Sequence, residues 1–173
     1  SLNNDNGYQS SVYFTKNNNG KWLKGKYSKY NSDSFNTGDI SFSSNKKIVF
    51  SICDFENSCD LVTLKNDKFS KLESINKKGN KNIQSHLVKH NNQEVLYFVS
   101  DREGGFGGMD IWLSMIDKNG NFGIPINAGE RINTSSDEIT PFFNPNDNTL
   151  YFSSNRKGGI GGFDVYKSSG KLN

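Results

Sequence analysis

A segment of about 50 residues recurs three times along this chain, and repetition at a fixed period is the signature of a repeat architecture. Residues 96–112 read LYFVSDREGGFGGMDIW, and residues 150–166 read LYFSSNRKGGIGGFDVY. Residues 48–62, IVFSICDFENSCDLV, form a shorter relative of both. Each unit reads as strand, turn and strand, which favours the blades of a β-propeller over a helical solenoid.

The composition points in the same direction. The 173 residues include 13 Phe, 7 Tyr and 2 Trp, whereas Ala128 is the only alanine. Aromatic residues favour strands and alanine is the strongest helix former. We therefore predict an all-β fold made of β-propeller blades, each a four-stranded antiparallel sheet.

Each unit divides into four strands, which we call a to d. Strand b is the apolar one, and strand d carries an aromatic residue after a turn, at Lys68–Phe69 and Asn121–Phe122. The chain is predicted to be one propeller segment, residues 1–173, that is partial or truncated. Its parts are a half blade of strands c and d (1–36), two blades (37–80 and 81–134) and a three-strand blade (135–173).

An open set of blades leaves strand edges with unpaired backbone groups. We therefore expect this segment to associate with itself or to be completed by another chain. The expected partners are other proteins of the cell envelope.

The two cysteines flank one hairpin tip. A hairpin brings its two strands within disulfide distance, so Cys53 and Cys59 are predicted to form a disulfide that closes a small loop. The alternative is a pair of buried free thiols. A disulfide indicates an oxidising compartment, which predicts a periplasmic, outer-membrane or cell-surface location.

The two longer tips are rich in glycine and are followed by an aspartate. Glycines permit positive φ in a hairpin tip, and an aspartate at the start of strand c can accept hydrogen bonds from the backbone of the tip. We interpret both as structural, with calcium binding as the alternative for the aspartates. These residues are Gly104, Gly105, Gly107, Gly108, Gly158, Gly159, Gly161, Gly162, Asp60, Asp110 and Asp164.

No catalytic residue, metal site or cofactor is predicted. The glycine run lacks the last glycine of a dinucleotide fingerprint and the lysine of a P-loop. The carboxylates have no fixed spacing, and the S-x-x-K match at Ser154 lacks its companion motifs.

Charge and hydropathy exclude two partner classes. The net charge is +3, but the lysines are scattered, which argues against a nucleic-acid groove. No run of apolar residues is long enough to span a membrane, and residues 1–5 show no signal peptide. A processed secreted protein would look the same.

Arginine and large apolar residues occupy equivalent places in the two glycine tips. Residues of these kinds on loops are common anchors of protein recognition. Our expected partner contacts are Arg102, Phe106, Arg156 and Ile160.

The stretch from Leu150 to Arg156, with Gly161 to Tyr166, resembles the WD40-like propeller repeat of the TolB type. Residues 132–143 resemble the version found in Bacteroidota envelope proteins of the OmpA family, some of which belong to type IX secretion and gliding complexes. The resemblance covers residues 39–166. It implies a propeller of the cell envelope without catalytic residues.

These arguments together predict a non-enzymatic propeller that serves as a protein-interaction scaffold. The alternative is a glycan-binding or glycan-processing propeller. That alternative requires aromatic residues, such as Trp22 or Trp112, and carboxylates to converge on one mouth of the ring.

Overall fold

The computed structural model describes residues 9–43, 46–56 and 58–170, and within these ranges every regular element is a β-strand. Residues 1–5, where the sequence predicts no signal peptide, lie outside the described ranges. Among the described residues, no helix has the length and apolar character needed to cross a membrane.

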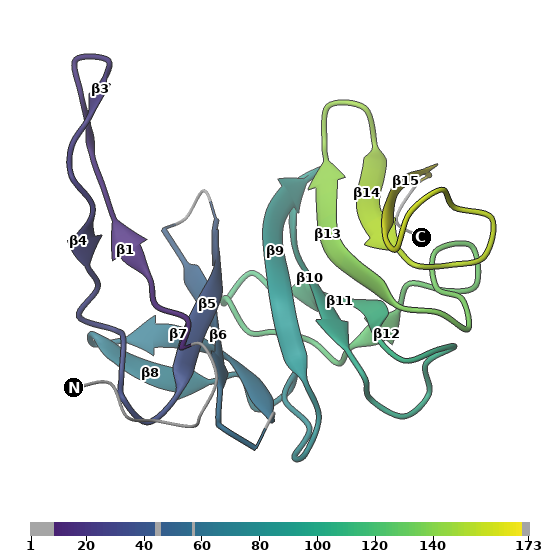
Figure 1. Ribbon diagram of the computed structural model, residues 1–173, viewed down its shortest axis with the longest axis horizontal. Helices are drawn as coiled ribbons and strands as arrows, with labels where there is room; N and C mark the ends of the chain where they lie inside the picture. Colours follow the sequence, from purple (N-terminus) through teal and green to yellow (C-terminus); the bar gives the residue numbers. More distant parts are fainter. Residues whose placement is uncertain (1–8, 44–45, 57, 171–173) are drawn as a thin grey trace.

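Three antiparallel sheets lie side by side (Figure 1). The first consists of β5 (Asn36–Phe42), β6 (Ile48–Cys53), β7 (Cys59–Lys65) and β8 (Lys68–Lys71). The second consists of β9 (Asn82–His90), β10 (Gln93–Ser100), β11 (Asp110–Ile116) and β12 (Ile126–Asn127). The third consists of β13 (Glu138–Asn144), β14 (Thr149–Ser154) and β15 (Asp164–Ser169). The predicted all-β fold of antiparallel propeller blades is confirmed.

The strand registers show that the three sheets are copies of one unit. A phenylalanine of strand b faces the same position of strand c in each sheet: Phe50 opposite Val62, Phe98 opposite Trp112 and Phe152 opposite Tyr166. All three phenylalanines are buried. The repeat in the sequence is therefore also a repeat of packing.

The hydrophobic core is divided between the two junctions of neighbouring sheets. One cluster joins the first and second sheets and contains Val49, Leu61, Leu96 and Phe98. The other joins the second and third sheets and lies around Tyr97 and other residues that include Val99, Ile111, Phe143 and Leu150. The middle sheet is thus covered on both faces, because its strands are apolar on both.

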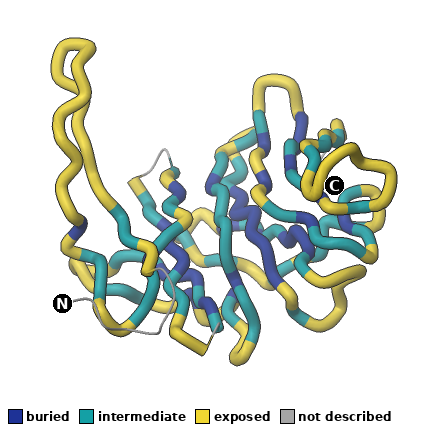
Figure 2. The backbone as a smooth tube through the Cα atoms, viewed as in Figure 1, coloured by how far each residue is buried: buried dark blue, intermediate teal, exposed yellow. Residues whose placement is uncertain are grey.

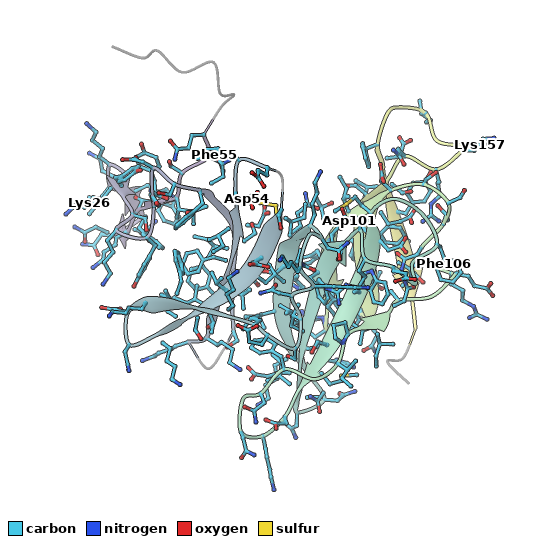
Figure 3. All side chains as sticks on the ribbon, turned by 90° about the horizontal axis from the view of Figure 1, so that it is seen from below. Lys26, Asp54, Phe55, Asp101, Phe106 and Lys157 are labelled. Atoms are coloured by element: carbon cyan, nitrogen blue, oxygen red, sulfur yellow. A yellow bond between two sulfur atoms is a disulfide. The ribbon has the colours of Figure 1, made fainter. Side chains whose placement is uncertain are left out.

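The first strands of the sheets, β5, β9 and β13, are neighbours (Figure 1). They therefore line one side of the arc that the sheets form. The hairpin tips between strands b and c lie along one side of the molecule, where Figure 3 labels Asp54, Asp101 and Lys157.

Before the first sheet the chain forms a projecting hairpin, which we call the arm. It pairs β1 (Tyr13–Phe14) with β4 (Lys26–Tyr27), and farther out β2 (Asn17–Asn18) with β3 (Lys21–Trp22). Asn19 and Gly20 both have positive φ and form its tight turn. The strand d of the predicted half blade (1–36) is therefore β4, which pairs with β1, and Lys21–Trp22 belong to the tip of the arm.

The fourth strand of the second sheet also differs from expectation. The predicted segment Asn121–Phe122 makes only an isolated bridge to Ile116, and β12 pairs with β11 instead. Pro125 stands between them and has no N–H to donate to a ladder. The hairpin is therefore interrupted and resumes one residue after the proline.

Candidate functional site

We call the first strand of each sheet (β5, β9 or β13) its inner strand. Each inner strand contains the same bulge, at which its pairing register with the second strand of the sheet shifts. The first bulged residue has a left-handed backbone in all three: φ is 46° at Asp39, 51° at Gln84 and 53° at Thr140. We call these three residues the inner row. Since β5, β9 and β13 are neighbours, the inner row runs across all three sheets.

Hydrogen bonds connect the inner row from sheet to sheet. The Gln84 backbone N–H donates to Asp39 Oδ2 at 3.2 Å, and the Thr140 N–H donates to Gln84 Oε1 at 2.9 Å. The Ser51 hydroxyl also donates to Asp39 Oδ2, at 2.8 Å. Asp39 and Gln84 thus each accept the backbone N–H of the next bulge, so the row is held in a fixed geometry.

The backbone at Thr140 is strained. A left-handed conformation is uncommon for any residue with a side chain and is an outlier for a β-branched one. Such strain amounts to about 1–3 kcal/mol and is found most often at binding and catalytic sites. The inner row is therefore a better candidate for function than the glycine tips.

Aromatic rings lie beside the inner row, on the same strands. The ring centroids of His86 and Phe142 are 4.8 Å apart, and His86 Nε2 lies 3.2 Å from the Phe143 carbonyl oxygen. Phe142 is 53% exposed. Burial lowers the pKa of His86 and outweighs the opposite effect of the Phe143 carbonyl. A neutral His86 donates its Nε2–H to this carbonyl.

Asp39 is the one carboxylate of the inner row, and it is exposed. Its neighbours in the row, Gln84 and Thr140, offer an amide and a hydroxyl. The arrangement can therefore bind a polar ligand and hold one carboxylate against it. Within the described ranges, no group of three or more His, Cys, Asp or Glu residues is placed to hold a metal ion.

The aspartates at the start of strand c have two different roles. Asp110 accepts a hydrogen bond from the Phe106 N–H, and Asp164 accepts one from the Ile160 N–H at 2.8 Å. Asp60 instead forms an ion pair with Lys71 at 2.5 Å, and in its tip it is Asp54 that accepts hydrogen bonds from backbone N–H groups.

The tip glycines serve two purposes. Only Gly104 and Gly158 have positive φ, at 91° and 96°. At Gly105 and Gly159 a methyl group would overlap the carboxylate of Asp110 or Asp164, and at Gly107 it would overlap backbone carbonyls. Gly108 lies against Asp137, whereas a methyl group at Gly162 would meet open space.

The two tip arginines are held inside the protein. Arg102 lies over the rings of Phe98 and Trp112 and donates to the Ile75 carbonyl at 2.7 Å. Burial lowers the pKa of Arg102 to about 10.

Arg156 repeats this arrangement over Phe152 and Tyr166, with the Ile132 carbonyl as acceptor. Of the four expected contact residues, Phe106 and Ile160 are the ones with largely exposed side chains, at 48% and 102%.

Cys53 and Cys59 form a disulfide across the β6–β7 hairpin, visible as the yellow bond near Asp54 in Figure 3. Trp22 and Trp112 do not meet. Trp22 is exposed on the arm, whereas Trp112 is buried under Arg102 between two sheets. Neither tryptophan belongs to β5, β9 or β13, the strands that carry the inner row.

The inner row was not singled out from the sequence. Asp, Gln and Thr differ in charge and shape, and polar residues are common throughout the chain, so the equivalence of Asp39, Gln84 and Thr140 is visible only in the backbone. A second repeated feature, an asparagine at the end of each linker, is visible in the sequence. Each of three similar linkers ends in an asparagine whose side-chain amide accepts from one backbone N–H of strand c and donates to one carbonyl: Asn31, Asn76 and Asn133.

No protein-family model and no curated protein matches this chain. Several solved structures are similar, and two of them are named here. One is the GH93 α-L-arabinofuranosidase of Fusarium graminearum in complex with arabinobiose, with a TM-score of 0.54 and 10% sequence identity over 92% of this chain and 54% of that chain. The other is the GH43 endo-arabinanase of Bacillus licheniformis, with a TM-score of 0.47 and 13% identity over 86% of this chain and 59% of that chain.

The arabinofuranosidase likeness supports the propeller fold, and this chain spans about half the length of that structure. This likeness corrects the expectation of a non-enzymatic protein-interaction scaffold, because the similar structure with this fold is a glycoside hydrolase. The resemblance to the TolB-type repeat, the envelope partners and the partner contacts of the tips stay predictions.

Proposed function

We propose that this chain is part of a glycan-processing β-propeller in which an oligosaccharide lies over the inner row. The observation that carries the proposal is the exposed carboxylate of Asp39, fixed on a bulged inner strand beside Gln84 and Thr140. The likeness to an arabinofuranosidase propeller supports a glycan as the ligand. We take oligosaccharides of arabinose as the first substrate class to examine.

The chemistry assigns a limited role to these residues. Glycoside hydrolysis uses two carboxyl groups, one as an acid and one as a base or nucleophile. Asp39 supplies one carboxylate, and the described inner row holds no other. Gln84 and Thr140 would hydrogen-bond sugar hydroxyls, and the exposed ring of Phe142 offers an apolar face for stacking on a sugar ring.

The test is hydrolysis of arabino-oligosaccharides by the purified protein and by its Asp39→Asn variant. Asn keeps an acceptor for the Gln84 N–H but removes the charge. We expect hydrolysis to fall by about 10²-fold or more, as for the loss of an acid–base group. Glu103→Gln is the matched control, because Glu103 is an exposed carboxylate on a tip.

Absence of both hydrolysis and oligosaccharide binding in the unaltered protein would refute the proposal. Equal losses in Asp39→Asn and Glu103→Gln would also refute the role of Asp39. Binding without hydrolysis, lost on Asp39→Asn, would assign the inner row to glycan recognition alone.

We also propose that the protein works in an oxidising compartment outside the cytoplasm. The disulfide between Cys53 and Cys59 supports this location, because cytosolic thiols are kept reduced. Mass spectrometry of the protein from its native host, alkylated before reduction, would test it. Free thiols at both cysteines would contradict this location.

A further inference from the structure

The arm is built like the outer half of a sheet. Asn31 accepts the Val12 N–H and donates to the Val12 carbonyl, both at 2.8 Å. Asn76 clamps Leu61, and Asn133 clamps Ile111, with the same pairs of bonds. Val12 therefore stands where strands β7 and β11 have Leu61 and Ile111.

The register of the arm agrees with this equivalence. Tyr13 faces Tyr27 as Val62 faces Lys71 and as Trp112 faces Asn127. β1 is thus a strand c and β4 a strand d. In the first two sheets strand c has a second neighbour, because β7 pairs with β6 and β11 pairs with β10. Within the described part of the chain, β1 pairs with β4 alone.

The free edge of β1 has a defined orientation. The Val12 N–H is bound by Asn31, and the Val12 carbonyl accepts from both Asn31 and Ser28, so the backbone of Val12 faces β4. Successive backbone groups of a strand alternate in direction. The N–H and C=O of Tyr13 therefore point to the free edge, where they are available to another strand.

The side chains of the arm lack the cover that their counterparts have. Tyr13 is 62% exposed, whereas Val62 is 0% and Trp112 is 7% exposed. Tyr27, Trp22 and Leu23 are also exposed, and Figure 2 shows the arm as almost entirely exposed. Exposed apolar residues gathered on one element mark a surface that binds another protein segment.

We propose that the free edge of β1 binds an antiparallel strand from a partner polypeptide segment with the sequence pattern of strand b. That pattern is two apolar residues followed by phenylalanine, as in Ile48–Phe50, Leu96–Phe98 and Leu150–Phe152. The phenylalanine would lie opposite Tyr13, because Phe50, Phe98 and Phe152 lie opposite the equivalent residues. This is β-augmentation, in which main-chain bonds supply affinity and side chains supply specificity.

A second copy of this chain does not fit the role. Its three strands of this kind, β6, β10 and β14, are each paired on both sides. A copy would have to open one of its own sheets to donate such a strand. The inference concerns the arm alone and does not depend on the proposed glycan site.

The experiment uses the purified protein and a synthetic peptide of residues 82–100, which contains the strands β9 and β10 of this chain. We expect the peptide to slow hydrogen exchange of the Tyr13 amide about tenfold or more, since a tenfold change corresponds to about 1.4 kcal/mol, the scale of one hydrogen bond. The Val12 amide, already bound by Asn31, should not change. A peptide carrying Phe98→Asp should bind about tenfold more weakly or not at all.

Two proline variants give a matched pair. Tyr13→Pro removes the N–H at the proposed edge and should abolish peptide binding. Val165→Pro makes the same change in β15, whose outer edge is unpaired among the described strands, and should leave binding intact.

Three results would overturn the proposal. The first is no protection of Tyr13 at saturating peptide, and the second is protection of Val165 in place of Tyr13. The third is protection of Tyr13 by dimerisation of the protein without peptide, which sedimentation would detect. The assay does not involve hydrolysis, so its failure is separate from failure of the glycan proposal.

Discussion

The two glycine hairpins share a sequence but not an environment. Residues 101–109 connect β10 to β11, and residues 155–163 connect β14 to β15. Ile111, just after the first tip, is fully buried, whereas Val165, its counterpart after the second, is 75% exposed. One side of the first tip contacts residues 134–137, which lead into the next sheet, and Asn127 of β12 binds Asp110 just after the tip. The local sequence thus determines the loop, and the neighbouring segments determine how far the strand that follows it is buried.

The aspartates of the two tips show the same contrast. Asp110 is 1% exposed, and its Oδ2 accepts from Phe106 N–H and from Asn127 at 3.2 Å. Its Oδ1 is buried and has no hydrogen-bond partner among the described residues. Burial raises the pKa of Asp110, and the hydrogen bonds from Phe106 and Asn127 only partly oppose this effect. Asp164 accepts from Ile160 and Gly161 and has no covering strand within the described part of the chain.

The largest expected effect on stability is at the arginines of the two hairpins. Here the second hairpin, although it is the more exposed, should lose more stability when its arginine is removed. Arg156 lies 3.3 Å from the Glu138 carboxylate, which is fully buried, whereas Arg102 donates to the neutral amide oxygen of Asn82. Removing one partner of a buried ion pair costs about 3–5 kcal/mol. We expect Arg156→Ala to lower the free energy of unfolding by about 4 kcal/mol and Arg102→Ala by about 2 kcal/mol.

Urea unfolding of both variants measures this difference. The variant Glu138→Gln in the Arg156→Ala background removes the uncompensated charge and should restore part of the loss. Equal losses for Arg102→Ala and Arg156→Ala, with no rescue by Glu138→Gln, would show that stacking on the aromatic rings is the main contribution in both hairpins.

The next expected effect is on the thermal stability of variants at Gly107 and Gly161, which occupy equivalent positions in the two tips. A methyl group on Gly107 would overlap the carbonyl oxygens of Thr134 and Ser136, which belong to the segment that contacts the first tip. At Gly161 the nearest atom would be the Phe163 carbonyl oxygen, at 3.8 Å, which is ordinary contact. Forced overlap in a packed region costs about 1–3 kcal/mol.

We therefore expect Gly107→Ala to lower the melting temperature clearly and Gly161→Ala to leave it almost unchanged. Thermal unfolding followed by circular dichroism would measure both. A loss in Gly161→Ala as large as in Gly107→Ala would mean that the second tip is also covered in solution.

Local sequence patterns predict the strands and the tip of each repeated unit, but not which neighbouring segments pack against that unit. The motif around Phe98 and Phe152 predicts strands b and c and the tip between them, because alternation and turn chemistry are local. The burial of Asp110 depends on long-range contacts such as the hydrogen bond from Asn127 of β12, which no local pattern reveals. The inner row was missed for a related reason: a bulge is a backbone feature, and residues as different as Asp39 and Thr140 adopt it.

The arginines show a different limit of local patterns. Arginines on loops are common anchors of protein recognition, so the sequence predicts Arg102 and Arg156 as partner contacts. In the structure their planar side chains lie over aromatic rings of strands b and c and reach the linker carbonyls. The signal was present in the sequence, since each arginine follows a repeated Phe and precedes a repeated aromatic residue of strand c. Spacing alone could not show that these residues stack.

A smaller effect separates the two aspartates. Asp110→Ala leaves the Phe106 N–H and the Asn127 amide without their acceptor in a buried site, which costs about 2 kcal/mol. Asp164→Ala exposes the freed N–H groups to water, so we expect a loss of about 1 kcal/mol or less. Urea unfolding of the two variants under the same conditions gives the comparison. A larger loss for Asp164→Ala would contradict the view that burial determines the contribution of the aspartate.

The smallest expected effect is a pH dependence of the free energy of unfolding, which arises from His86 at the junction between the second and third sheets. Burial lowers the pKa of His86 in the folded state below its usual value of 6.5. Below about pH 6.5 the unfolded chain therefore binds a proton at His86 that the folded protein does not, and stability falls as the pH drops toward the lowered value. The contribution is fully present above pH 6.5.

The variant His86→Phe isolates this contribution, because Phe142 occupies the equivalent position of β13 and shows that the site accepts an aromatic ring. The free energy of unfolding should fall less in His86→Phe than in the unaltered protein between about pH 8 and about pH 5. Asp110, whose pKa is raised, acts in the opposite direction and is present in both proteins, so it cancels in the difference. An identical pH profile for the two proteins would mean that His86 is protonated equally in the folded and unfolded states, and that the junction is open to water.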